Sequence, residues 1–570
     1  MTSKLGNVLL MNFQKSTVAM ELLIFLGSIA ACISVSFYLL VTQGKYSLLY
    51  YGDSISHLVI ARRVIDSIIP GFIQLGGVWL PMTHLMLLPL VINDTLFHTG
   101  LAGTMVSSIS TAFTALLLFR IASTQFNSTK LGILCSVLFM LNPSVVYMGI
   151  VPMMEAPFIM FFMLGVYYFH GWYYSYANKR GSCVSQYMIL LKCALAISAA
   201  CLTRYEGWLL PFGLVLAILA VYIFVTNERQ KCRIEPFLAF ASALSVLGII
   251  LWLLWNTVIF KDPMFFANGQ YSAAVQAAAR PYSSHLHMHP IASLVIMSNV
   301  ALAMYGLPVL IISLVGIIAY FFANGRNQLY FRLILVVALM TPIMADFAAM
   351  LQGSGEIYPV GDKSWYNGRY LVFVSPVIAF GSTSVIFFVD KRIIKEARKR
   401  KSALITIIPV AFVIFCYSII LFAQPFEVGN TIAMSDSYTS LLPSRKVDSF
   451  NYQTGITIGK LYAQGGGEEN NTQSIVLFAP NQVGQEIMFA SNLPLRKFID
   501  VSAGIYWDIS RVSPWIYGKY LILAKPTQSQ NANSDPELKT IRYWRTHEVY
   551  LFKFYRVNYE NQYFCILTKK

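Results

Sequence analysis

The sequence predicts a polytopic α-helical membrane protein whose C-terminal part is a water-exposed α/β domain. Only 12% of the 570 residues are charged and 56% are hydrophobic, whereas a soluble domain usually has about 25% charged residues to cover its surface. Apolar runs of about 20 residues, the length of a helix that crosses a bilayer, recur through most of the chain. After about residue 424 the chain becomes more polar, and short alternating segments replace the long apolar runs.

The apolar runs predict about eleven membrane spans. They lie at residues 20–43, 99–121, 131–147, 156–175, 187–203, 208–226, 237–260, 303–323, 332–350, 370–389 and 402–423. The segment 81–97 is also apolar, but it is short and contains Pro81 and Pro89. Because proline interrupts a helix, we expect this segment to be a re-entrant or interface-lying part of a long first outer loop, residues 44–98.

Basic residues predict the orientation of the spans. The later loops on one side hold 14 Lys and Arg residues, seven of them between Lys391 and Lys401, and the facing loops hold five. Loops rich in Lys and Arg stay in the cytoplasm. The N-terminus is therefore expected inside the plasma membrane and the C-terminus outside it. Lys4 and Lys15 precede the first apolar run without a clear cleavage site, which predicts an uncleaved span. The net charge of +16 is thus an orientation signal and does not indicate a nucleic-acid partner.

Residues 424–570 are expected to form an accessory domain outside the membrane, separate from a transmembrane catalytic module at residues 1–423. A linker-like stretch at Gly465–Asn471 is followed by a predicted strand, helix and strand at 475–479, 482–490 and 495–501. Further strands are predicted at 519–524 and 548–554. Alternating helices and strands indicate an α/β fold.

Ionisable side chains at the outer ends of the spans are the candidate site residues, because charge near a bilayer is costly and is usually functional. Asp53 and His57 follow the first span and would share a helix face at positions i and i+4. A carboxylate base could then lie beside an imidazole. The alternative is that Asp53 is the N-cap of an interfacial helix and that His57 is solvated.

Later outer turns contribute two more acids and two arginines. Glu155 begins an outward-facing span, where its alternative role is to match the helix dipole. Arg204 and Arg369 carry planar guanidinium groups that suit a phosphate. Arg204 could instead neutralise Glu206, and Arg369 could be an interface anchor.

A group of three histidines in a later outer loop, His285, His287 and His289, would share one face if the chain were extended. This arrangement could bind a metal such as zinc, but a solvated polar loop is the favoured interpretation. The chain has no P-loop, no GxGxxG and no HExxH motif, so nucleotide-driven transport and common metalloprotease chemistry lack support.

Several of these motifs, in this order, make the chain resemble the GT-C superfamily of membrane glycosyltransferases. They are Gly52-Asp53, Ala61-Arg62, the segment 77–84 that ends in His84, Glu155, the segment 203–208 that includes Tyr205, and the segment 255–266. The sequence motifs are most similar to those of prokaryotic, archaeal-looking members of one branch of the superfamily. This branch, which resembles glycosyltransferase family 39, contains protein O-mannosyltransferases and aminoarabinose transferases.

The resemblance implies an inverting glycosyltransferase that moves a sugar from a polyprenyl-phosphate donor to an extracytoplasmic protein, lipid or glycan. It implies that Asp53 is the catalytic base and that Glu155 positions the acceptor or is linked to a metal. Arg204 and Arg369 would bind the donor phosphate, with support from His57, Arg62, His84, Tyr205 and Glu206. The residues imply no particular cofactor. Whether the enzyme binds a divalent metal is left open.

Two departures limit the resemblance. Ser54 follows Asp53 where the mannosyltransferases have an Asp-Glu pair, which leaves the division of roles open. The Trp-Trp-Asp signature of oligosaccharyltransferases is also missing, which argues against transfer of a whole glycan. A secondary transporter and a non-catalytic envelope scaffold are the alternatives. Transporters, however, place ionisable groups near the bilayer midplane in repeated halves, and no internal repeat is visible here.

Overall fold

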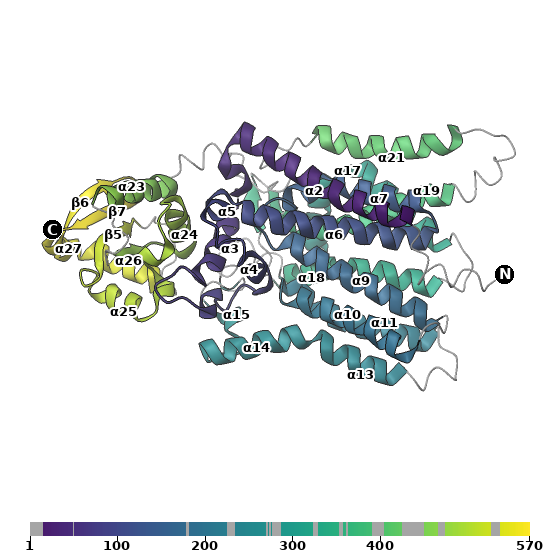
Figure 1. The fold of residues 1–570 in the computed structure, drawn as a ribbon, viewed down its shortest axis with the longest axis horizontal. Helices are drawn as coiled ribbons and strands as arrows, with labels where there is room; N and C mark the ends of the chain where they lie inside the picture. The colour runs from purple at the N-terminus through teal and green to yellow at the C-terminus, as the bar shows by residue number, and fades with distance from the viewer. Residues whose placement is uncertain are drawn as a thin grey trace.

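The computed structural model shows a bundle of long helices with a smaller α/β domain at one end (Figure 1). It describes residues 15–49, 51–177, 182–224, 234–269, 272, 275, 287–322, 329–352, 357–360, 363–366, 368–389, 404–423, 450–465, 474–525 and 536–570. The predicted class, a polytopic helical membrane protein with a C-terminal domain, is confirmed.

Each of the predicted spans contains helix. The bundle consists of α2 (Lys15–Gln43), α6 (Leu101–Phe126), α7 (Thr129–Met140), α8 (Pro143–Met148), α9 (Glu155–Ala177), α10 (Cys183–Cys201), α11 (Leu210–Phe224), α13 (Ile234–Ser245), α14 (Leu247–Phe260), α17 (Pro290–Phe322), α18 (Leu329–Leu351), α19 (Ser375–Val389) and α21 (Leu404–Ala423). Within the described residues, eight helical segments are long and apolar enough to cross a membrane.

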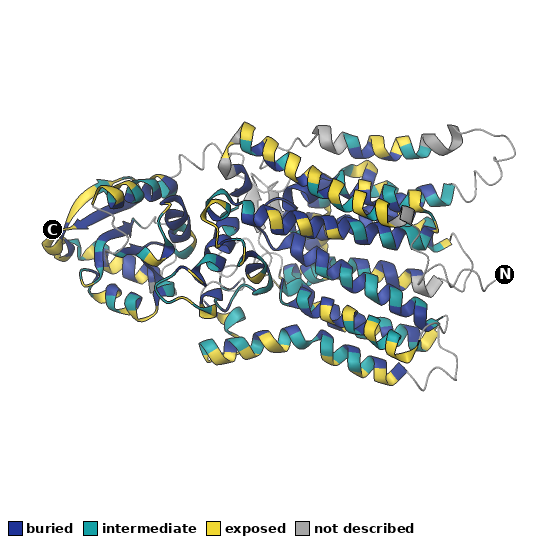
Figure 2. Cartoon of the chain, viewed as in Figure 1, coloured by how far each residue is buried: buried dark blue, intermediate teal, exposed yellow. Residues whose placement is uncertain are grey.

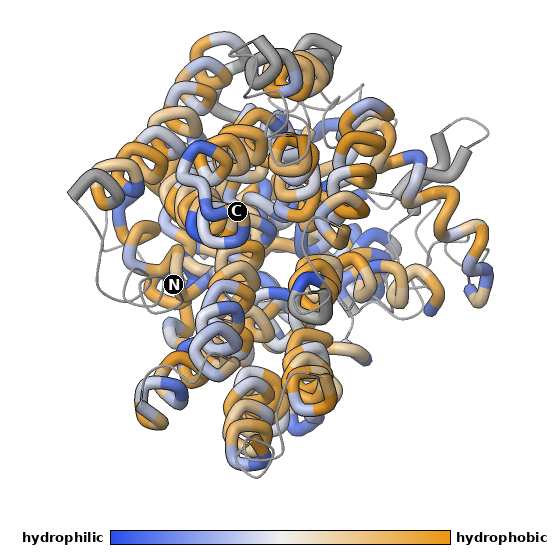
Figure 3. The backbone as a smooth tube through the Cα atoms, turned by 90° about the vertical axis from the view of Figure 1, so that its right-hand side faces the viewer, coloured by the Kyte–Doolittle hydropathy of each residue, from blue (hydrophilic) through white to orange (hydrophobic). Residues whose placement is uncertain are grey.

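Unlike a soluble protein, the bundle exposes many large apolar side chains on its outer surface. Leu23, Phe37 and Val41 of α2 are large apolar side chains that point outward, and exposed residues recur on the outer helices in Figure 2. Figure 3, which views the bundle from its right-hand end in Figure 1, shows apolar residues out to the periphery. Such a surface is stable only where lipid is the solvent.

Two helices differ from their predicted form. Helix α17 begins at Pro290, well before the predicted residue 303, and is broken at Gly306, which adopts φ 70° and ψ 147° two residues before Pro308. The segment 81–97 contains only the short helices α4 (Met82–Leu87) and α5 (Asp94–Thr99) and therefore no spanning helix.

The first outer loop lies between the bundle and the C-terminal domain (Figure 1). Besides α4 and α5 it contains η1 (Lys45–Leu49), α3 (Gly52–Arg63) and η2 (Phe72–Leu75). Apolar residues of this loop, among them Ile55, Leu58 and Phe97, belong to the same buried cluster as Phe489 and Ile522 of the C-terminal domain. The loop and the domain therefore share one hydrophobic core.

The C-terminal domain is built on a five-stranded sheet in the order β4-β3-β5-β7-β6. Its strands are β3 (Ser474–Phe478), β4 (Phe498–Ile499), β5 (Gly518–Ala524), β6 (Tyr555–Glu560) and β7 (Phe564–Lys569). Strand β3 is parallel to β4 and β5, whereas β7 is antiparallel to β5 and β6. The helices are α23 (Phe450–Gln464), α24 (Asn481–Ala490), α25 (Ile505–Val512), α26 (Pro536–Thr546) and α27 (Glu548–Phe554).

The predicted strands at 475–479 and 519–524 and the predicted helix at 482–490 are confirmed as β3, β5 and α24. The predicted strand at 548–554 is wrong, because this run forms α27 and the strands β6 and β7 follow it. A short apolar run does not distinguish strand from helix by periodicity. The predicted strand at 495–501 is reduced to the two residues of β4. Apart from Gly465, the predicted linker Gly465–Asn471 lies outside the described residues, as does the basic loop 391–401.

Candidate functional site

Five of the predicted site residues come together where the outer loop meets the bundle. They form an ionic cluster, defined as Asp53, Glu155, Arg204, Glu206 and Arg369. Arg369 Nη1 lies 2.7 Å from Asp53 Oδ2, and Arg369 Nε lies 3.8 Å from Glu155 Oε1. Arg204 Nη1 lies 2.8 Å from the same Glu155 oxygen. Arg204 also forms a bidentate pair with Glu206, at 2.5 Å and 3.2 Å.

The acids of the ionic cluster differ in their access to solvent. Glu155 is fully buried, and its Oε2 has no hydrogen-bond partner among the described residues. A buried carboxylate is stable only with nearby positive charge, which the two arginines supply. The side chain of Asp53 is 28% exposed, compared with 14% for Glu206. Asp53 is therefore the acid most open to an incoming molecule.

Packing between α6 and the chain before α9 places Glu155. The hydroxyl groups of Thr104 and Ser107 donate hydrogen bonds to the carbonyls of Ile150 and Val151, at 2.7 Å and 2.6 Å. Gly103 lies so close to Pro152 that an added Cβ would collide with the proline ring. Hydroxyl donors and a missing side chain thus draw this segment onto α6 and fix the start of α9 at Glu155.

The arginines are held by aromatic rings as well as by acids. Tyr370 lies in η6 (Gly368–Val374), and its ring contacts both guanidinium groups, 5.2 Å from Arg204 and 5.0 Å from Arg369. Arg369 also lies 5.5 Å from the ring of Tyr51. The sequence motifs contain Tyr51 and Tyr370, but sequence reasoning did not single them out. Tyr370 directly follows Arg369 and Tyr51 lies two residues before Asp53, and this proximity was the available signal.

Tyr205 supports the site by joining two segments. Its hydroxyl donates a hydrogen bond to the carbonyl of Val78 and accepts one from Trp252 Nε1 at 3.3 Å. Trp255 Nε1 donates to the carbonyl of Gly76 at 2.9 Å. These bonds tie the outer-loop segment before α4 to the turn that carries Arg204.

His57 and His84 form a buried pair beside the ionic cluster. His57 Nδ1 and His84 Nε2 lie 2.9 Å apart, so one neutral ring donates a hydrogen bond to the other. Burial, followed by the charges of Arg369 and Arg204, lowers the pKa of His57 to about 3. Burial and the neighbouring His57 also lower the pKa of His84. Both rings are therefore neutral at physiological pH.

The alternative interpretation of Asp53 as an N-cap is wrong. Tyr51 occupies the N-cap position of α3 without a side-chain cap, and Asp53 lies within the first turn. His57 is buried, not solvated. Its ring packs against Trp79 and His84 of the same outer loop, with ring centroids 4.6 Å and 5.1 Å away, contacts that the local sequence could not reveal.

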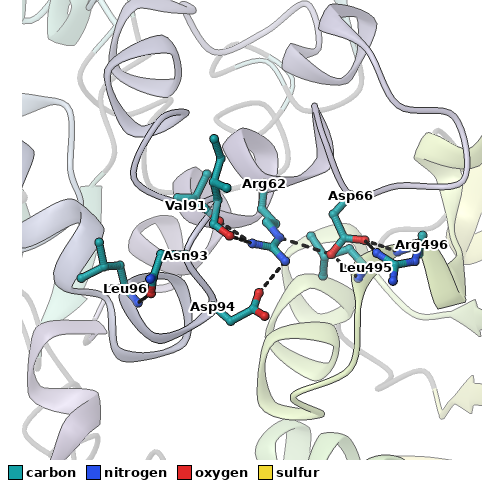
Figure 4. A network of polar contacts seen from close by, with 9 residues as sticks. Arg62, Asp66, Val91, Asn93, Asp94, Leu96, Leu495 and Arg496 are labelled. Carbon is teal, nitrogen blue, oxygen red and sulfur yellow. Dashed lines mark hydrogen bonds and ion pairs between the residues drawn. The ribbon is translucent and has the colours of Figure 1, made fainter. Parts of the chain in front are cut away.

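Arg62 lies outside the ionic cluster, at the opposite end of α3, where it contacts Asp66 and Asp94 (Figure 4). Of the predicted histidine group, His285 lies outside the described residues, whereas His287 and His289 are exposed. No group of three potential metal-binding side chains occurs in the part of the chain that the structure describes.

A sequence comparison identifies the family of the central segment. Residues 76–263 match the profile of the dolichyl-phosphate-mannose-protein mannosyltransferase family. The chain carries a GT-C superfamily glycosyltransferase domain. The prediction of a membrane glycosyltransferase that uses a lipid-linked sugar donor is confirmed. The matched segment of this GT-C domain contains Glu155, Arg204 and Glu206, while Asp53 and Arg369 lie on either side of it.

Solved structures with a similar outline include AglB and ArnT. The archaeal oligosaccharyltransferase AglB of Archaeoglobus fulgidus, in complex with an inhibitory peptide and a dolichol-phosphate, has 12% identity and a TM-score of 0.48, over 89% of this chain and 70% of that one. ArnT of Cupriavidus metallidurans bound to undecaprenyl phosphate has 12% identity and a TM-score of 0.48, over 92% and 97%. At this level the similarity carries no argument about activity. No curated protein matches the chain.

The buried histidine pair predicts that mild acid destabilises the GT-C protein. The pKa of His57 falls from its ordinary value of 6.5 to about 3 on folding. The unfolded chain therefore binds more protons in this window, and stability falls as the pH drops from about 6.5 toward 3. Melting temperatures of the purified protein between pH 7 and pH 4.5 would measure this slope. We expect His57→Gln to flatten it and His287→Gln, at an exposed position, to leave it unchanged. An unaltered slope in His57→Gln would contradict the assignment.

Proposed function

We propose that this glycosyltransferase moves a sugar from a polyprenyl-phosphate donor to a hydroxyl group of an extracytoplasmic protein, lipid or glycan, with inversion at the anomeric carbon. The observation that supports the proposal is the ion pair between Asp53 and Arg369 at 2.7 Å. It places the most exposed acid of the ionic cluster beside a guanidinium group, which is suited to bind a phosphate.

In this reaction the acceptor oxygen attacks the anomeric carbon while the bond from that carbon to the phosphate oxygen breaks. Asp53 accepts the proton of the acceptor hydroxyl as a general base. The phosphate leaves with the electron pair of the broken bond, and Arg204 and Arg369 stabilise its charge. Glu155 holds both arginines through Oε1, while its Oε2 can accept a hydrogen bond from a substrate hydroxyl.

Charge balance in the ionic cluster couples the two substrates. Three carboxylates face two guanidinium groups, and His57 is neutral. A donor phosphate adds further negative charge, so it has to compete with a carboxylate for an arginine. Asp53 is the most exposed of the three acids and is the one expected to yield. Donor binding at Arg369 would then release Asp53, so that the base becomes free only when a donor is present.

Asp53→Asn is expected to lower transfer by about 10²-fold or more, the usual contribution of a general base. The same change is expected to tighten binding of the lipid phosphate, because an amide competes less well than a carboxylate for Arg369. Single-turnover transfer from dolichyl-phosphate mannose measures the first effect, and titration with dolichyl phosphate measures the second. Asp508→Asn, at an exposed acid of the C-terminal domain, serves as the matched control.

Transfer at the wild-type rate by folded Asp53→Asn protein would move the base to Glu155 or Glu206. If transfer were lost but the affinity for dolichyl phosphate did not rise, Asp53 could remain the base while the competition for Arg369 would be disproved.

Arg369→Lys is expected to weaken donor binding although the charge is retained. A guanidinium group can face Asp53 and a phosphate through separate N–H groups, whereas an ammonium group acts as a single point charge. The affinity for dolichyl phosphate and the KM for the donor should both change, and Arg511→Lys provides an exposed control. Wild-type values for both quantities would reduce Arg369 to a structural partner of Asp53.

We infer that the C-terminal domain lies outside the plasma membrane and that the N-terminus lies inside. Helix α2 begins at the end of the bundle opposite the C-terminal domain (Figure 1), and the basic loop at 391–401 precedes the last span. A phosphatase reporter that is active only outside the cytoplasm should be active when fused after Lys570 and inactive when fused at Arg229. The reverse pattern would overturn the orientation and the face assigned to the site.

A further inference from the structure

The C-terminal end of α3 is fastened to the C-terminal domain through one buried carboxylate. Asp66 Oδ2 accepts a hydrogen bond from the backbone N–H of Leu495 at 3.1 Å, and Oδ1 accepts one from Arg496 Nη1 at 3.0 Å. Arg62 Nε donates to the same carboxylate at 3.2 Å (Figure 4). Asp66 therefore joins the end of α3 to the chain just before β4.

Arg62 extends this junction to the other arm of the outer loop. Its Nη1 donates hydrogen bonds to the carbonyls of Val91 and Ile92, at 2.5 Å and 2.9 Å. Its Nη2 forms an ion pair with Asp94 at 2.5 Å. Both arms of the loop and the C-terminal domain thus meet in one network (Figure 4).

A second, separate ion pair crosses the same interface. Arg63 contacts Asp500, and both side chains are largely buried. Asp500 is fixed in turn, because its Oδ1 accepts hydrogen bonds from the N–H and the hydroxyl group of Ser502. Gln74 Nε2 donates to the carbonyl of Ser502 at 3.2 Å.

The N-terminal end of α3 also contacts the C-terminal domain. A Cβ added to Gly52, the residue before Asp53, would collide with the side-chain amide of Gln482 at the start of α24. Between the two ends, Ile55 and Leu58 pack into the core that the loop shares with the domain. The domain therefore touches α3 along its whole length.

From these contacts we infer that the C-terminal domain positions the base of the proposed transfer reaction, and that Asp66 and Arg63 are the positioning residues through which it acts. This inference rests on the proposed role of Asp53. A 12-residue helix such as α3 is marginal in isolation. Its course is therefore set by what it packs against. With both ends of α3 held by the domain, the helix carries Asp53 to its place opposite Arg369.

The test compares Asp66→Asn with Glu548→Gln in the full-length protein. Glu548 forms an ion pair with Arg545, and its helix α27 lies at the end of the C-terminal domain away from the outer loop (Figure 1), so its loss tests the domain's own stability. We expect Asp66→Asn to lower kcat about 10- to 100-fold, the effect of misplacing a catalytic group by about 1 Å. Because a displaced Asp53 competes less well for Arg369, the affinity for dolichyl phosphate should not fall below the wild-type value, and amide hydrogen exchange in α3 should accelerate. Glu548→Gln should change none of these.

Arg496→Gln supplies a second variant. It should leave the fold intact, because the Arg496 side chain is 54% exposed. It should show the same kcat loss in weaker form. The double variant should be no worse than Asp66→Asn alone, because residues in one network are not additive. A wild-type kcat and wild-type exchange in α3 for folded Asp66→Asn would overturn the inference.

The two proposals fail in different ways. If Asp53→Asn protein kept its transfer rate, the role of Asp53 would be lost. Exchange in α3 would still report whether the domain orders the helix. If exchange in α3 accelerated in Asp66→Asn while kcat stayed at the wild-type value, the domain would be a structural support only, and the positioning role would be refuted whatever the result at Asp53.

Discussion

A carboxylate that is fully buried at the end of a membrane bundle has to be neutralised, and much of the arrangement around the site follows from this requirement. Glu155 lies where α9 begins, and Arg204 and Arg369 both approach its Oε1. An unpaired charge that is buried there would cost too much free energy. The two arginines in turn require Glu206 and Asp53, and the rings of Tyr51 and Tyr370 cover their faces.

This requirement also supports the proposed division of roles between the acids. Glu155 lies between two cations and away from solvent, so it is suited to hold the arginines in place. Asp53 comes from α3, and among the residues that the structure describes only Arg369 pairs it with the cluster. An acid at the rim can be exchanged for a phosphate without exposing the buried one. The division of roles that the sequence left open therefore has a physical basis in burial.

The spans and the charged members of the ionic cluster could be predicted from the sequence, because both depend on local composition. Apolar runs of sufficient length have few alternatives to crossing the bilayer, and acids and arginines at the ends of such runs are rare enough to notice. The ion pair of Arg369 with Asp53 joins residues 316 positions apart, and no local pattern encodes it. His57 packs against Trp79 and His84 from another part of the outer loop, so its burial was missed for the same reason. Helix α27 was mistaken for a strand because a seven-residue apolar run fits both periodicities.

The core shared by the outer loop and the C-terminal domain has a consequence for biosynthesis. Residues such as Leu58 and Phe97 leave the ribosome early, whereas their partners Phe489 and Ile522 are synthesised after every span of the bundle. Chains are made at about 5–20 residues per second, so the loop has to wait roughly 20 seconds or more before its apolar surface can be covered. Contacts between such distant segments also form slowly. The first loop to be synthesised is therefore among the last parts of the protein to fold, and a chain that is truncated near its end would be left with an open loop and no assembled site.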